Sequence, residues 1–153
     1  MGVILARAGA SEEVVVAGIL HDTIEDSHAD HKVTKEILTK RFGRDVAALV
    51  DSVTEQNKEL SWEDRKREAL KHVEAFSHES LMLKSADIIA NTSEIIEDHR
   101  KDGNATFDRF NAPKEKILQN YQHMITAIIE RWPNNPLVLD LREIAFQLTV
   151  ISR

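Results

Sequence analysis

The sequence predicts an all-α protein, an orthogonal helical bundle formed by a single domain that spans residues 1–153. Apolar residues recur with helical spacing in nearly every segment, and no run alternates between apolar and polar residues as a half-buried strand does. The chain contains only five Gly and three Pro, which is few for a loop-rich β fold. Brief connections join the predicted helices, as is typical of helical bundles.

The N-terminal segment predicts two helices. Residues 1–8 are helical in composition but begin without a capping residue, so they resemble the second half of a helix. Ser11 is a suitable N-cap for the helix that contains the apolar run of residues 14–20. We expect that helix to be buried because the run contains no polar side chain.

Two further helices are expected before residue 54. Residues 34–42 end at Gly43, which is a common stop residue, and residues 44–53 follow directly. The side chains that we expect to face the core are Ile37, Leu38 and Phe42 in the first helix, and Val46, Leu49, Val50 and Val53 in the second.

Four helices are expected in the second half of the chain. Ser61 and Asp64 open the first of them as a capping box in its short-acid form. Pro113 suits the first turn of the third helix, and Pro133 ends that helix. The predicted ranges are 61–75, 80–99, 113–132 and 136–151.

Composition and charge exclude several classes of function. The net charge of −6 argues against binding to duplex nucleic acid, because phosphate contacts require concentrated Lys and Arg. The absence of Cys excludes a disulfide framework and a thiolate zinc site. No apolar run has the length of a membrane span. We therefore expect a cytoplasmic protein with neither a membrane nor a duplex nucleic acid as its partner; a homo-oligomer is left open.

The most informative segment is residues 21–26, His-Asp-Thr-Ile-Glu-Asp, which directly follows the apolar run. Burying three acids and an imidazole there would cost several kcal/mol (an order-of-magnitude estimate) unless a cation or buried partners offset it. On a continuous helix, His21 and Glu25 would share nearly one face with Asp22 and Asp26. The pattern predicts a metal site with its own acid or base. A polar network without metal is the alternative.

A second candidate segment lies in the predicted long helix. Asp87 interrupts an apolar face, and Lys84, Asp87 and Asn91 lie in one stripe at helical spacing. Hard divalent cations favour carboxylate and imidazole ligands, so Asp87 is the best candidate to complete a site with His21. An ordinary surface stripe with a Lys–Asp pair explains the same spacing equally well.

The ordered set of segments resembles the HD-domain metal-dependent phosphohydrolases, and within them the stand-alone branch that hydrolyses guanosine tetraphosphate (ppGpp). An isolated His-Asp dipeptide would carry no information, whereas the whole set in this order is specific. The segments that carry the resemblance are residues 17–27, 42–46, 49–54, 65–67 and 83–87, together with Asn91.

The resemblance implies one bound divalent metal, usually Mn²⁺, and hydrolysis of the 3′-pyrophosphate of a guanosine polyphosphate. It places metal ligands at His21, Asp22 and Asp87. It places the acidic pair that positions or activates the attacking water at Glu25 and Asp26. A metal that lowers the pKa of water, with a nearby carboxylate as proton acceptor, is chemically consistent with these roles.

The resemblance also places substrate contacts at Lys84, Asn91 and Arg65. A solvated basic face on the helix of residues 61–75 is an equally good explanation for Arg65. The ppGpp branch often has an Arg-Thr pair shortly after the position of Asn91, where this chain has Ser93-Glu94. An HD phosphohydrolase of another nucleotide, such as a deoxynucleoside monophosphate, therefore remains an alternative.

The first metal ligand of the family is a histidine in a His-Pro pair that would align upstream of Met1. We therefore expect this chain to lack the N-terminal helix of the domain and to provide only three protein ligands to the metal. Metal affinity should then be lower than in the family. A catalytically silent nucleotide-sensing module is a further alternative for such a chain.

Overall fold

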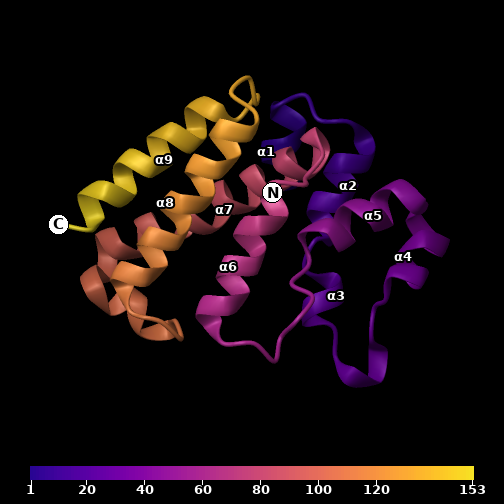
Figure 1. The fold of residues 1–153 in the computed structure, drawn as a ribbon, viewed down its shortest axis with the longest axis horizontal. Helices are drawn as coiled ribbons and strands as arrows, with labels where there is room; N and C mark the ends of the chain where they lie inside the picture. The colour runs from indigo at the N-terminus through magenta and orange to yellow at the C-terminus, as the bar shows by residue number, and fades with distance from the viewer.

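The computed structural model describes residues 1–153 and contains nine α-helices and two short 3-10 helices without a strand, which confirms the all-α bundle (Figure 1). No helix is both long enough and apolar enough to cross a membrane. The α-helices are α1 Gly2–Arg7, α2 Glu12–Leu20, α3 Thr23–Asp26, α4 Lys35–Phe42, α5 Arg44–Val53, α6 Trp62–Val73, α7 His78–Asp102, α8 Lys114–Arg131 and α9 Val138–Ile151, and the 3-10 helices are η1 Ala29–His31 and η2 Gly103–Arg109.

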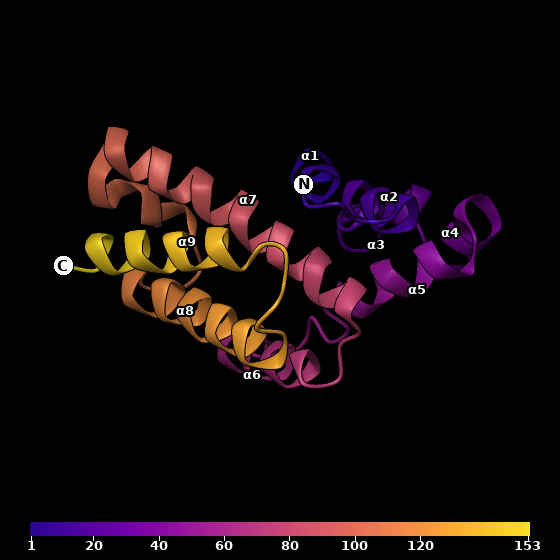
Figure 2. The same ribbon diagram turned by 90° about the horizontal axis from the view of Figure 1, so that it is seen from above.

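Helix α7 is the central element of the fold. Figure 2 shows it crossing the molecule diagonally, with α1, α2 and α5 toward one end and α8, α9 and η2 toward the other. It begins two residues earlier than the sequence predicts, because the hydroxyl of Ser77 caps it by accepting a hydrogen bond from the Ser80 N–H at 3.1 Å. It ends at Gly103, whose φ of 60° is a conformation that favours glycine.

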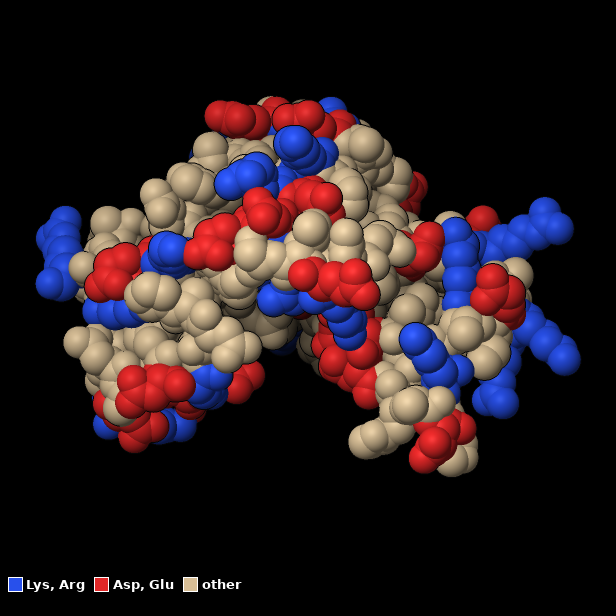
Figure 3. Space-filling view, turned by 60° about the horizontal axis from the view of Figure 1, so that its bottom comes forward, with Lys and Arg blue, Asp and Glu red and all other residues tan.

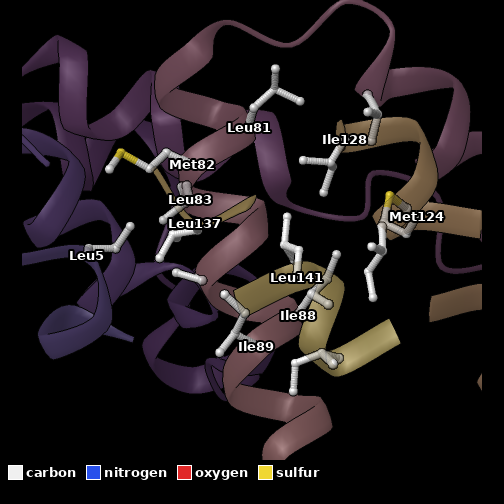
Figure 4. Close-up of a cluster of buried hydrophobic side chains, with 14 of the residues drawn as sticks. Leu5, Leu81, Met82, Leu83, Ile88, Ile89, Met124, Ile128, Leu137 and Leu141 are labelled. Atoms are coloured by element: carbon white, nitrogen blue, oxygen red, sulfur yellow. The ribbon is translucent and has the colours of Figure 1, made fainter. Parts of the chain in front are cut away.

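One continuous core surrounds α7. Figure 4 shows Leu5 of α1 beside Leu83 of α7, and Met124 and Ile128 of α8 on the other side of the same cluster. Leu137 and Leu141, which lie at the start of α9, complete it. The segments before and after α7 therefore bury their apolar side chains against the same helix.

The prediction of one continuous helical face across residues 21–26 is wrong. Helix α2 ends at Leu20, His21 and Asp22 form a turn, and α3 begins at Thr23. The Thr23 hydroxyl donates to the Leu20 carbonyl at 2.7 Å and so stabilises the turn. The break gives His21 and the α3 side chains separate orientations.

The predicted inward faces of α2 and α4 are also partly wrong. Ile19 of α2 is 67% exposed, although Val14 and Ala17 of the same helix are buried. Ile37 and Phe42 of α4 are 39% and 45% exposed. Helix α4 packs mainly against α5 at the edge of the molecule, so no second element covers its outer side (Figure 1).

Gly18 allows α1, α2 and α7 to approach one another directly before the turn. A Cβ atom at this position would collide with Cδ1 of the fully buried Leu5 and would lie 3.5 Å from Cδ1 of Leu83. Because the Gly18 carbonyl also accepts a hydrogen bond from His21, this close packing helps to position the histidine.

We expect Gly18→Ala to lower the free energy of unfolding measured by urea denaturation. Overpacking a core costs about 1–3 kcal/mol, more than the ~0.5–1 kcal/mol gained by replacing a helical glycine. In a Leu5→Ala background the cost of Gly18→Ala should shrink, because the colliding methyl group is absent. An equal cost in both backgrounds would contradict this packing explanation.

Candidate active site

The candidate site is a cavity of about 300 Å³ whose walls come mainly from Met1, the turn after α2, α3, the end of α5, the loop of residues 54–57, and helices α6, α7 and α8. The face drawn in Figure 3 is hollowed between two lobes, and acidic and basic side chains lie close together on it. Of the eight sequence-predicted site residues, the structure brings seven to the cavity wall: His21, Asp22, Glu25, Arg65, Lys84, Asp87 and Asn91.

His21 lies between two carboxylates. Its Nδ1 is 2.9 Å from the Gly18 carbonyl, which can only accept a hydrogen bond, so Nδ1 carries a proton. Its Nε2 is 2.9 Å from Oδ2 of Asp22 and 3.6 Å from Oδ1 of Asp87. An Nε2 lone pair directed at two carboxylates would be repelled, so this geometry requires a cation there, either a proton or a metal.

The pKa of His21 reflects this environment. The hydrogen bond with Asp22 raises the pKa most, burial opposes the rise, and the charges of Asp22 and Asp87 add to it. The two carboxylates therefore stabilise the imidazolium form of His21.

Asp87 is held on α7 by two neighbours of the predicted stripe. Its Oδ2 accepts a hydrogen bond from Lys84 Nζ at 2.8 Å, and its Oδ1 accepts one from Asn91 Nδ2 at 2.8 Å. Burial raises the pKa of this carboxyl, but Lys84, the charge of His21 and the hydrogen bond of Asn91 together outweigh burial and hold the pKa below its usual range. The three side chains thus form a connected row, as their spacing predicts.

Glu25 is fixed by the loop that follows α5. Its Oε1 accepts a hydrogen bond from the backbone N–H of Glu55 at 2.7 Å, and its backbone carbonyl accepts one from Lys58 Nζ at 2.8 Å. Asp26 is exposed and does not line the cavity, so the structure does not bring it to the other predicted residues. Its catalytic role stays a prediction.

Glu55 is a residue of the site that the sequence does not single out. Its Oε2 accepts from Arg65 Nη1 at 3.0 Å and its Oε1 from Lys66 Nζ at 2.6 Å. Burial raises the pKa of Glu55, but Lys66 and then Arg65 outweigh it and keep the pKa below its ordinary value of 4.5. The only local feature that could have marked Glu55 as a site residue is its position directly after the Val53-Thr54 pair.

Tyr121 is a second such residue. It lies on the apolar stripe of α8, where its spacing predicts a core position, yet it lines the cavity. Burial raises the pKa of its hydroxyl, which favours the neutral form of Tyr121. The helical period correctly places Tyr121 on the inner face of α8 but cannot reveal that a cavity adjoins that face.

The chemical types of the donor groups suit a divalent cation, but the distances between them do not. One imidazole nitrogen and two carboxylates converge at His21 Nε2, and these are ligands that Mn²⁺ and similar metals accept. As the side chains stand, however, no group of three or more His, Cys, Asp or Glu is spaced to hold a metal ion. Because Lys84 and Asn91 engage Asp87, its carboxylate would have to turn to bind one.

Comparisons with known proteins show which proteins the chain is similar to. A model of the HD domain family matches residues 1–88. A guanosine-3′,5′-bis(diphosphate) 3′-pyrophosphohydrolase, MESH1, of Danio rerio is 36% identical over 83 residues, 54% of this chain and 43% of that protein. A GTP pyrophosphokinase of Myxococcus xanthus is 44% identical over 70 residues, 42% of this chain and 9% of that protein. The chain thus spans less than half the length of these curated relatives.

A solved structure is similar over nearly the whole chain. The crystal structure of lmo0812 from Listeria monocytogenes EGD-e superposes with a TM-score of 0.84 at 30% identity. The match covers 99% of this chain and 92% of that protein. The likeness therefore includes α8 and α9, which lie beyond the residues that the family model matches.

The contacts of Glu55 predict how stability depends on pH. Because its folded pKa is below 4.5, its ion pairs contribute stability above that pH, and the contribution is lost as the pH falls through the folded pKa. We expect the difference in unfolding free energy between wild type and Glu55→Gln, measured by urea denaturation, to be larger at pH 7 than at pH 3.5. Glu68→Gln, which removes an acid from the same cavity wall, is the control. A difference for Glu55→Gln that stays constant with pH would contradict the assigned ion pairs.

Proposed function

The chain belongs to the HD-domain family, and we propose that it is a metal-dependent phosphohydrolase that cleaves the 3′-pyrophosphate of guanosine polyphosphates. The convergence of Asp22 and Asp87 on Nε2 of His21 carries the metal part of this proposal. The similarity to a ppGpp pyrophosphohydrolase of Danio rerio supports the choice of substrate. The resemblance of the motifs to that branch is the reason for proposing Mn²⁺ as the metal.

His21, Asp22 and Asp87 would hold the metal in this proposal. A divalent metal supplies Lewis-acid stabilisation of charge on a phosphoryl oxygen and a lowered pKa for the attacking water. The Nδ1–H bond to Gly18 fixes the tautomer of His21, so that Nε2 is the nitrogen available as a ligand.

Glu25 is the proposed proton acceptor of the reaction. The Glu55 N–H holds one of its carboxylate oxygens at 2.7 Å, which leaves the other free to take a proton from water. We propose Lys84, Asn91 and Arg65 as contacts for substrate oxygens. Asp26 would have to act from outside the cavity, through a shift of α3.

The charge of the cavity also supports a metal-dependent reaction. Five Asp or Glu side chains line it, against three Lys or Arg side chains. A polyphosphate would therefore meet an excess of negative charge unless cations entered with it. A divalent ion held by His21 and its neighbours would reverse the local field.

A catalytically silent nucleotide-binding module is the second candidate function. One observation favours it: Lys84 and Asn91 together engage both oxygens of Asp87, so the proposed ligand is already satisfied within α7. Metal binding and turnover, measured together, separate the two candidates.

The central test is hydrolysis of ppGpp by the purified chain with Mn²⁺, with the products resolved by chromatography. We expect GDP and pyrophosphate to appear, and EDTA to abolish their formation. Deoxynucleoside monophosphates serve as competing substrates in the same assay. Their hydrolysis with ppGpp left intact would overturn the substrate assignment, and the absence of both metal binding and turnover would favour the silent module.

A second test concerns the row on α7. We expect Asp87→Asn to weaken Mn²⁺ binding by more than about 10-fold, measured by calorimetry, and to abolish turnover, because a charged ligand is lost. Lys84→Met should instead tighten Mn²⁺ binding, because a competing ammonium group is removed, while KM for ppGpp rises. Asp98→Asn, which lies further along α7 and outside the cavity, is the matched control. Unchanged metal binding in Asp87→Asn would count against the ligand role.

A further inference from the structure

The side chain and the backbone of Glu55 face two different parts of the cavity. The carboxylate bridges Arg65 and Lys66 of α6, and the N–H of the same residue donates to Glu25. The side chain is only 21% exposed, and those of Arg65 and Lys66 are 27% and 30% exposed. Solvent therefore screens these ion pairs less than it screens a fully exposed pair.

The hydrogen bonds of the Arg65 guanidinium are incomplete. Glu55 accepts from Nη1, whereas the Nε–H is buried and has no hydrogen-bond partner. An unsatisfied buried donor costs about 1–3 kcal/mol. A ligand with several oxygens that turned the guanidinium toward the cavity would satisfy this donor, and phosphate binds guanidinium groups through two such bonds.

The loop that carries Glu55 is held independently of its side chain. Thr54 is buried and its hydroxyl donates to the Val50 carbonyl at 2.8 Å. Gln56 Nε2 donates to the Asp51 carbonyl at 3.2 Å, and Lys58 holds the backbone of Glu25. The Glu55 carboxylate can thus leave its partners while the N–H that holds Glu25 stays in place.

We infer that Glu55 is a positioning residue whose carboxylate takes the place of a substrate phosphate on Arg65 and Lys66, and that a phosphate group of the substrate displaces it. This inference rests on the proposed function for the class of ligand, a phosphorylated nucleotide. Before the ligand arrives, the Glu55 carboxylate offsets part of the positive charge of Arg65 and Lys66. It also presents both cations in a fixed position, at the cost of some affinity.

The test follows the binding of inorganic pyrophosphate in metal-free buffer by ¹⁵N NMR. The Arg65 Nε–H signal, assigned by its loss in Arg65→Lys, should shift as pyrophosphate is added. Glu55→Gln should lower the Kd for pyrophosphate by about three- to tenfold, because the competing charge is removed. Glu68→Gln removes an equal charge from the same wall, and Glu68 forms no ion pair with Arg65 or Lys66, so this variant should change the Kd by less.

Equal effects of the two variants, or weaker binding in Glu55→Gln, would overturn the inference. If Glu55→Gln does not fold, Glu55→Asp replaces it. The shorter side chain cannot bridge Arg65 and Lys66, so pyrophosphate binding should again tighten. Unchanged or weaker binding in Glu55→Asp would overturn the inference. In the hydrolysis assay, Glu55→Gln should lower KM, and the factor by which KM falls should exceed the factor by which kcat changes. The pyrophosphate titration needs no turnover, so a failed proposed function would appear in the wild-type assay and a failed inference only in the comparison of variants.

Discussion

The arrangement of the molecule depends on helix α7. Most of its sides are buried, while the row of Lys84, Asp87 and Asn91 remains polar. Leu83 and Ile88 of this helix are buried in the core, whereas Asp87 lies between them in sequence and reaches the cavity. A carboxylate in that position is costly unless it is paired. Lys84 and Asn91 satisfy it from the same helix, so the polar row requires no partner from elsewhere to be stable.

The cavity consequently has two charged centres of different construction. At one centre His21 faces two carboxylates, which favours a cation. At the other, Arg65 and Lys66 face a single carboxylate, which favours an additional anion. Glu55 joins the two centres, because its backbone holds Glu25 close to the first and its side chain occupies the second. A metal-dependent reaction on a phosphorylated substrate would use both.

Local patterns in the sequence grouped several cavity residues that are neighbours in the chain or on one helix. His21 and Asp22 are adjacent, and the row that contains Asp87 follows the helical period, so local patterns were sufficient to group them. Local patterns did not identify Glu55 and Tyr121 as residues of the cavity. Glu55 acquires its partners from α6, across the loop that precedes this helix, and Tyr121 has the spacing of a core residue, so neither carries a local signature.

The sequence by itself determined the helical class, most helix positions and the grouping of Lys84, Asp87 and Asn91, because these depend on period and capping residues. Only the tertiary structure decided that the chain turns at His21, that Asp26 stays outside the cavity, and that Glu55 bridges α6 and α3. The physical reason is that each of these three features depends on which distant element packs against the segment concerned. The packing of α1 and α7 around Gly18 precedes the turn, and the loop after α5 fixes Glu25, through contacts that no local pattern encodes.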